Sequence, residues 1–165
     1  MTDIVVRYAT EADLPEVWTM LRHLATSLKS SADFTVSAAE LREALFGPAP
    51  EMSVLVAARA FEVCGIATFY PIYSTWRGRR GIHLEDLYVL PAYRHAGVGS
   101  MLVAGLARLA IEREYTHVRW SVHSWNTQAV NFYESVGAQR DRYTDFYDLS
   151  GPELIDAAGG MRSVE

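Results

Sequence analysis

The chain has 165 residues, of which half are hydrophobic and 21% charged, with a formal net charge of −5. This composition is typical of one globular domain, and an acidic balance without a basic run argues against a dedicated nucleic-acid binder. A lone cysteine, Cys64, excludes an internal disulfide and a thiolate metal cluster. Neither a signal-peptide pattern nor an apolar run of membrane-spanning length is present, so we expect a cytoplasmic protein that binds no membrane.

Hydrophobic periodicity predicts an α/β fold over residues 1–165, with a mixed, mostly antiparallel sheet. We expect strands at 4–9, 54–60, 63–73, 83–89, 118–122 and 142–149. Helices are expected at 10–28, 37–46, 98–113 and 126–137, the first two opening on capping boxes. Short turns join the second, third and fourth strands, which predicts antiparallel pairing among them. Residues 157–165 are expected to form a loose tail.

The stretch from Leu84 to Ser100 combines a strand with two acids, a basic turn with glycines and the start of a long helix. Gly97 and Gly99 allow close approach of the backbone to a ligand, and a helix start offers free N–H groups to an anion. A P-loop is excluded because no Gly-Lys-Ser/Thr follows, and Leu102 stands where the dinucleotide fingerprint needs its third glycine. The stretch therefore predicts a phosphate site of another kind.

Arg-x-x-Gly-x-Gly from Arg94 to Gly99 resembles the pyrophosphate loop of the GNAT superfamily of acetyl-CoA-dependent N-acetyltransferases. The loop follows Leu-Glu-Asp-Leu-Tyr-Val, and both Trp125-Asn126 and Asn131-Phe132-Tyr133-Glu134 come further along the chain. Upstream, Tyr73-Ser74-Thr75-Trp76 before Gly78-Arg79 resembles the spermidine/spermine-type subgroup, which includes diamine and thialysine acetyltransferases. The resemblance covers about Ile4 to Leu149.

This resemblance implies a single GNAT domain with splayed central strands, acetyl-CoA as co-substrate, no metal and a homodimer. No metal is expected from the histidines either, because they show no ligand spacing. The residues that the resemblance implies for binding acetyl-CoA are Leu87, Tyr88, Val89, Arg94, His95, Ala96, Gly97, Val98, Gly99, Ser100, Asn126 and Tyr133.

The implied chemistry is acetyl transfer to a primary amine, which must lose a proton to attack. An alkylamine has a pKa of about 10.4, so a base is useful, either directly or through water. Glu85 and Asp86 are the candidates, and strand alternation predicts that at most one of them faces a given cleft. The alternation of side chains along a strand leaves open which of the two does. For both acids the alternative is a structural role, for example pairing with Arg79 or Arg94. The resemblance favours Glu85 as the catalytic residue, acting through ordered water, with Asp86 also near the amine.

Tyr133 is the candidate acid for the thiolate leaving group. The residues alone favour packing on an amphipathic helix as the role of this tyrosine, whereas the resemblance assigns it the catalytic role. Asn126 is expected to contact the pantetheine arm or to cap its helix, and the two roles are compatible. Tyr73 and Trp76 are expected to wall the amine site through cation–π contact, with a surface or core packing role as the alternative.

Some positions depart from the polyamine subgroup. His95 stands where that subgroup has glycine, Ala96 replaces a long polar residue, and Lys29 and Ser30 occupy a loop that is usually acidic, with Asp33 nearby. The leading interpretation is an N-acetyltransferase of a small amine: a diamine, a polyamine, a thialysine-like compound or an amine antibiotic. The alternatives are a protein or peptide N-acetyltransferase and a non-catalytic acyl-CoA-binding module.

Overall fold

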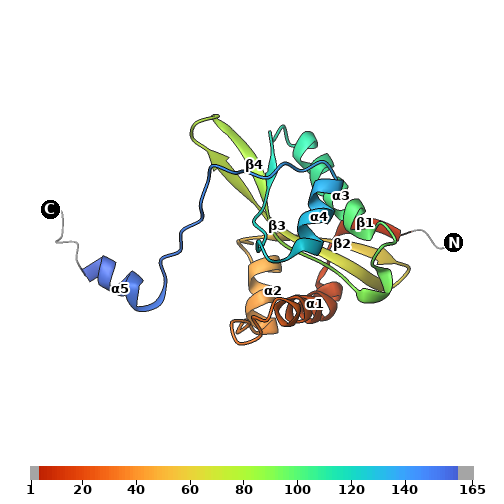
Figure 1. Ribbon diagram of the computed structural model, residues 1–165. Helices are drawn as coiled ribbons and strands as arrows, with labels where there is room; N and C mark the ends of the chain where they lie inside the picture. The colour runs from red at the N-terminus through yellow and green to blue at the C-terminus, as the bar shows by residue number, and fades with distance from the viewer. Residues whose placement is uncertain (1–3, 160–165) are drawn as a thin grey trace. The chain divides into compact units, whose positions relative to one another are not determined.

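The computed structural model describes residues 4–159, which form two compact units that meet in the sequence between His123 and Ser124. The first unit is built on a five-stranded open sheet in the order β1-β2-β3-β4-β5 (Figure 1). Neighbouring strands run antiparallel, except that β4 and β5 are parallel. The strands are β1 (Ile4–Tyr8), β2 (Ser53–Arg59), β3 (Glu62–Ser74), β4 (Arg79–Val89) and β5 (Val118–Arg119). The predicted α/β class with a mixed, mostly antiparallel sheet is confirmed.

Helices cover both faces of this sheet (Figure 1). The short 3-10 helix η1 (Glu11–Asp13) leads into α1 (Leu14–Ser27), which packs with α2 (Ala38–Phe46) on one face. The opposite face is covered by α3 (Val98–Glu112). None of the helices within residues 4–159 combines the length and the apolarity that a bilayer span requires.

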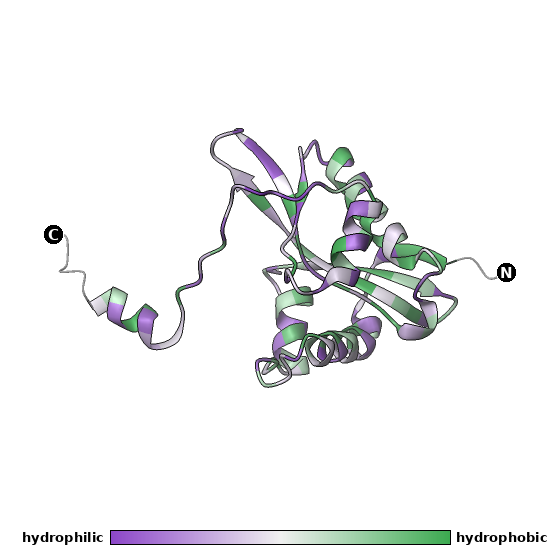
Figure 2. Ribbon diagram, in the orientation of Figure 1, coloured by the Kyte–Doolittle hydropathy of each residue, from purple (hydrophilic) through white to green (hydrophobic). Residues whose placement is uncertain are grey.

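Each face of the sheet has its own hydrophobic core. On the α3 face the core includes Phe69, Leu84 and Leu102, all at most 1% exposed. On the other face, Val17 of α1 and Ile66 of β3 are fully buried. Figure 2 shows hydrophobic residues along the strands and hydrophobic and hydrophilic residues alternating along the helices, as burial of a single helix stripe requires.

Local capping explains where the first helices begin. Ser37 Oγ accepts the N–H of Glu40 at 3.2 Å, and the Glu40 carboxylate accepts the N–H of Ser37 at 2.8 Å, which confirms the predicted capping box. At the other box, Asp13 accepts the N–H of Thr10 at 2.7 Å. Arg7 of β1 also donates to both oxygens of Asp13, and these hydrogen bonds hold the pKa of that carboxyl well below its usual range. The first strand is thereby tied to the first helix.

The second unit contains α4 (Thr127–Ser135) and α5 (Gly151–Gly159). The predicted strand at 142–149 is wrong, because these residues form neither helix nor strand. A strand needs a hydrogen-bonded neighbour, and the described part of this unit has no other strand. The strand predicted at 118–122 is shortened to Val118–Arg119. Residues 157–159 end α5, the rest of the expected tail lies outside the described residues, and the single domain stays a prediction.

Candidate active site

Strand β4 contains a bulge at Glu85. The register between β3 and β4 pairs Thr68 with Asp86 and Phe69 with Leu84, so Glu85 has no partner on β3. A bulge inserts one extra residue into one strand and interrupts the strict alternation of side chains at that point. The alternation that holds along the rest of β4 therefore changes phase at Glu85.

This change of phase brings both acids to the same face of the sheet. Leu84 and Leu87 both pack in the α3-side core, so the two residues between them lie on the face of α1 and α2. Tyr88 follows on that face, buried in its core. The expectation that at most one of Glu85 and Asp86 faces a given cleft is wrong, because it assumed an unbroken period of two.

Asp86 is held by a buried threonine. Thr68 Oγ1 donates to Asp86 Oδ2 at 2.9 Å and accepts the Asp86 N–H at 3.0 Å, and Thr68 is fully buried. Burial raises the pKa of the Asp86 carboxyl above its usual range, against the hydrogen bond from Thr68, and Glu85 adds to the rise. This pair joins the two strands at the bulge, and we expect it to hold the bulge in place. A contact of Asp86 with the amine stays a prediction.

Replacing Thr68 with Val is expected to lower the free energy of unfolding by about 2–4 kcal/mol, because a buried N–H and a buried carboxyl each lose their partner. Urea denaturation measures the loss, and Thr68→Ser, which keeps the hydroxyl, is the control, with an expected loss of about 1 kcal/mol. The penalty should shrink at acidic pH. The hydrogen bond from Thr68 lowers the pKa of Asp86, so its loss should raise that pKa further in the valine variant, and protonation on acidification then favours the folded variant more than the folded wild type. A valine variant as stable as the serine variant would contradict this role.

Glu85, in contrast, has a half-exposed side chain next to an aromatic pair. Its Oε2 lies 3.4 Å from Nε2 of His83, and the imidazole stacks on the ring of Tyr70 with centroids 5.0 Å apart. Burial raises the pKa of the Tyr70 phenol, the Glu85 carboxylate raises it further, and Arg119 acts in the opposite direction. The structure therefore gathers four side chains from three strands, whereas the sequence had singled out only Glu85.

Beyond this cluster no strand of residues 4–159 pairs with the outer edge of β4, so the ladder is open there. The ladder to β5 has two residue pairs and ends where His83 pairs with Arg119, which agrees with the predicted splay of the central strands. The Leu90 N–H donates to the Cys64 carbonyl on β3, so by alternation the backbone groups of Leu87 and Val89 point away from β3. The Val89 carbonyl accepts Arg94 Nε at 3.1 Å. The Leu87 N–H and C=O and the Val89 N–H therefore face the open side.

The side chain of Tyr88 is buried and its backbone pairs with Ile66, so its predicted contact with acetyl-CoA stays a prediction.

The basic turn after β4 leads directly into α3. A 3-10 turn, η2 (Pro91–Tyr93), is followed by Arg94, and His95 and Gly97 both have positive φ, of 62° and 82°. Gly97 is the N-cap residue of α3. A Cβ built on it would meet no atom of the described chain within 4 Å, so the space above the loop is open to a ligand.

The first turn of α3 presents free donors. No side chain caps the helix among the described residues, and the N–H groups of Val98, Gly99 and Ser100 precede the first i→i−4 bond, which Met101 makes to Gly97. Arg94 is exposed, with its guanidinium 5.6 Å from the centre of the Tyr88 ring. Converging N–H groups at a helix start, with a cation beside them, fit a diphosphate.

The second unit holds the remaining predicted residues. Asn126 Oδ1 accepts the Ala129 N–H at 3.2 Å, so the predicted N-cap role is confirmed and the pantetheine contact stays a prediction. Tyr133 is half-buried on α4, with its ring centroid 5.2 Å from that of Phe132, and its role as the acid stays a prediction.

Two further aromatic residues belong to the β3–β4 hairpin. Trp76 is 98% exposed and Tyr73 is 61% exposed, which excludes a core packing role for both and leaves the surface role as the alternative. Their contact with an amine stays a prediction.

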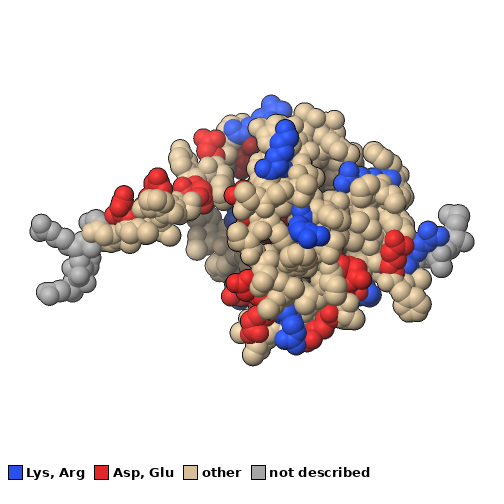
Figure 3. Space-filling view, turned by 90° about the horizontal axis from the view of Figure 1, so that it is seen from below, with Lys and Arg blue, Asp and Glu red and all other residues tan. Residues whose placement is uncertain are grey.

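Figure 3, which views the molecule from the side of α1 and α2, shows acidic and basic side chains interspersed. This distribution differs from the continuous acidic surface that a long polycation would need.

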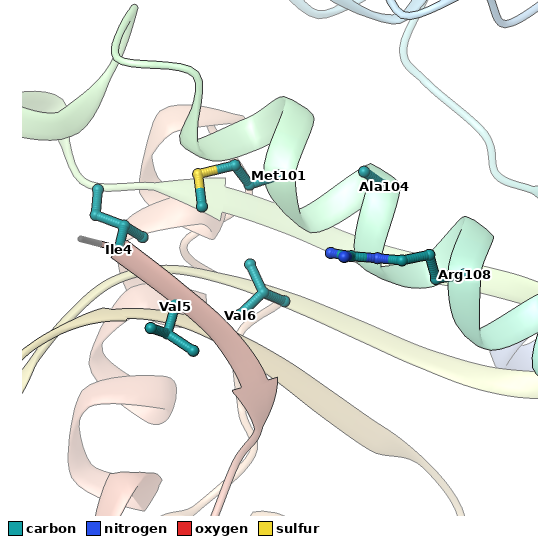
Figure 4. Close-up of a pocket in the computed structure, with 6 residues that line it drawn as sticks. All are labelled: Ile4, Val5, Val6, Met101, Ala104 and Arg108. Carbon is teal, nitrogen blue, oxygen red and sulfur yellow. The ribbon is translucent and has the colours of Figure 1, made fainter.

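A groove of about 600 Å³ lies elsewhere, between β1 and α3 (Figure 4). Its lining is apolar apart from one arginine and includes no candidate catalytic residue. The residues that line it are Ile4, Val5, Val6, Met101, Ala104 and Arg108.

Comparisons with known proteins agree with this geometry. The Acetyltransferase (GNAT) family matches residues 18–138. Thialysine N-epsilon-acetyltransferase of Mus musculus is 36% identical over 147 residues, which cover 84% of this chain and 86% of the mouse protein. L-ornithine N5-acetyltransferase of Arabidopsis thaliana is 36% identical over 92 residues, covering 56% of this chain and 40% of the plant protein.

Solved structures show the same fold. An integron cassette protein from V. cholerae has a TM-score of 0.79 at 23% identity, covering 96% of this chain and 98% of the other. An aminoglycoside acetyltransferase from a soil metagenomic sample has a TM-score of 0.73 at 19% identity, covering 89% and 97%. The overall fold of the chain is therefore one already seen in acetyltransferases.

Proposed function

This chain belongs to the GNAT family of N-acetyltransferases, and we propose that it moves the acetyl group of acetyl-CoA to the primary amine of a small molecule. The observation that carries the proposal is the bulge in β4, which sets a half-exposed carboxylate beside the open strand edge that leads to the helix-start phosphate site. The mouse and plant relatives are named for thialysine and L-ornithine, which are both small primary amines.

Acetyl-CoA fits the groups that the first unit presents. Its diphosphate would lie against the N–H groups of Val98, Gly99 and Ser100, with Arg94 beside it and the space above Gly97 open. The backbone groups of Leu87 and Val89 on the open side of β4 suit the pantetheine arm, which Asn126 would also contact. His95 and Ala96 complete the turn. Bound acetyl-CoA supplies an activated thioester carbonyl.

In the proposed reaction the amine nitrogen attacks the thioester carbonyl, so that an N–C bond forms and the C–S bond breaks. Glu85 accepts the amine proton through an ordered water. The N–H of Leu87 or Val89 stabilises the developing oxyanion. The Tyr133 phenol gives its proton to the departing thiolate and is reprotonated from water. A phenol pKa of about 10 against a thiol pKa of about 8.5 makes this transfer uphill by roughly 2 kcal/mol, which a positioned acid can supply.

Gly97→Val is expected to abolish acetyl-CoA binding without unfolding the domain, because the added side chain enters the space above the loop. Isothermal titration calorimetry should give the wild type a dissociation constant of roughly 1 μM to 1 mM, the usual range for such substrates. Gly137→Val is a matched control, since Gly137 also has a positive φ and open space at its Cβ. Equal affinity in the wild type and the Gly97 variant, or no binding by the wild type at millimolar concentration, would contradict the site.

The amine class is tested by thiol release from acetyl-CoA over a panel of short diamines, spermidine, thialysine, aminoglycosides and peptides. We expect turnover with small primary amines. Turnover only with peptides would favour the protein N-acetyltransferase alternative, and binding without turnover of any amine would favour the acyl-CoA-binding module.

We also propose a homodimer. The support is three exposed aromatic side chains close together in the sequence of the second unit, where Tyr143, Phe146 and Tyr147 are each more than 80% exposed. Large aromatic residues are usually at least partly buried in a protein or an interface. Light scattering coupled to size exclusion would give a monomer mass if this proposal is wrong.

A further inference from the structure

The face of the sheet on the side of α1 and α2 carries an acid and a base that both lie next to one aromatic pair. Tyr70 stacks on His83, Glu85 lies 3.4 Å from the imidazole, and Arg119 is the register partner of His83 on β5. Electrostatic effects of both Glu85 and Arg119 reach the Tyr70 phenol, with opposite signs. The two charges therefore face a common surface.

Arg119 shares this face because of the sheet register. Residues that pair directly across two strands project to the same side, so Arg119 lies with His83. Its neighbour Val118 packs in the core of the α3 face, as alternation requires. Glu85 lies one strand across and two residues along from Arg119. With strands about 4.8 Å apart and a rise of about 3.3 Å per residue, their Cα atoms are roughly 8 Å apart.

The Arg119 side chain is available for a ligand. It is exposed, and within residues 4–159 no ion pair or side-chain hydrogen bond engages its guanidinium. The charged and titratable groups near it are His83, Glu85 and Tyr70, together with His117. Burial lowers the pKa of His117, as do the positive charges of Arg77 and Arg119. A second ammonium group would meet this positive region, whereas a carboxylate would complement it.

We propose that Arg119 binds a carboxylate of the substrate while the reacting amine lies at Glu85, so that the enzyme selects amino-acid amines over diamines. A guanidinium is the side chain best suited to this task, because its planar fork meets a carboxylate in two parallel hydrogen bonds. Arg119 is thus a specificity-determining residue. This inference rests on the proposed acetyltransferase function and adds the substrate's second functional group to it.

Matched substrates that differ only in the carboxylate test the inference. Lysine and 1,5-diaminopentane form one pair, and ornithine and 1,4-diaminobutane form another. The ratio of kcat/KM for the amino acid to kcat/KM for its diamine is measured in the wild type, Arg119→Gln and Arg119→Lys. The control is Arg108→Gln, which makes the same charge change at an exposed residue of α3, the helix on the other face of the sheet.

We expect the wild type to prefer each amino acid, and Arg119→Gln to reduce that preference by about tenfold or more, mainly through a higher KM for the amino acid. The lysine variant should keep part of the preference, since it retains the charge without the fork. Arg119→Gln should keep the wild-type KM for acetyl-CoA and the wild-type melting temperature. In the control Arg108→Gln the ratio of kcat/KM values for amino acid and diamine should equal that of the wild type.

The outcomes separate this inference from the proposed function. Acetylation of diamines with no preference for amino acids, or an unchanged ratio in Arg119→Gln, overturns the role of Arg119 and leaves the acetyltransferase proposal standing. A wild-type enzyme that acetylates no member of either pair and no other small amine overturns both.

Discussion

Tyr133→Phe is expected to slow acetyl transfer roughly 10²- to 10⁴-fold, because a general acid at the leaving thiolate contributes an effect of that size. The substitution keeps the ring, and with it the contact to Phe132, and removes only the hydroxyl. A tyrosine that serves only in packing would lose at most one hydrogen bond, about 0.5 to 1.5 kcal/mol of stability, with little change in turnover. Single-turnover measurements with saturating acetyl-CoA give the rate of the chemical step.

Two controls accompany this measurement. Acetyl-CoA affinity and the melting temperature of Tyr133→Phe should stay near the wild-type values, which separates loss of chemistry from loss of binding or folding. Tyr115→Phe makes the same change at a partly buried tyrosine that packs against the α3-side core and has no part in the proposed reaction, so it should leave turnover unchanged. If Tyr133→Phe turns over within a few-fold of the wild type, the thiolate leaves unprotonated or takes its proton from water, and Tyr133 is not the acid.

Glu85→Gln is expected to lower kcat/KM by roughly 10²-fold or more at neutral pH, since the amine then lacks its base. The loss should shrink as the pH approaches the amine pKa of about 10.4, because free amine needs no base. The measurement is a pH profile of kcat/KM for the wild type and the variant from neutral pH upward. A loss that is uniform across pH would show that Glu85 binds or supports the site without accepting a proton.

Asp86→Asn is the matched comparison, one residue further along the same face of the sheet. Asparagine can still accept the Thr68 hydroxyl, so the bulge should persist. We expect no loss that shrinks with rising pH in this variant. If Asp86→Asn shows the shrinking loss and Glu85→Gln does not, the base is Asp86.

Much of the fold was predictable because its signals are local. The Ser37 capping box marked the start of α2 correctly, since its two hydrogen bonds join residues three apart. The strand–turn–helix from β4 to α3, where the phosphate site is proposed, was predictable for a similar reason: Pro91 ends the strand, and Gly97, with its φ of 82°, occupies a backbone conformation that favours glycine. The strand predicted at 142–149 failed because its aromatic residues express only a preference for β structure, and a strand forms only where a neighbour accepts its hydrogen bonds.

By itself, then, the sequence determined the order of the helices and strands of the first unit, the glycine-bearing turn that opens α3 and the presence of two acids before it, all features set by residues a few positions apart. Only the tertiary structure decided which way those acids point. The bulge at Glu85 depends on Thr68 and Asp86, eighteen residues apart, and the position of Arg119 depends on a parallel register between β4 and β5. Such pairings arise from packing between distant segments, whose partners no local pattern specifies.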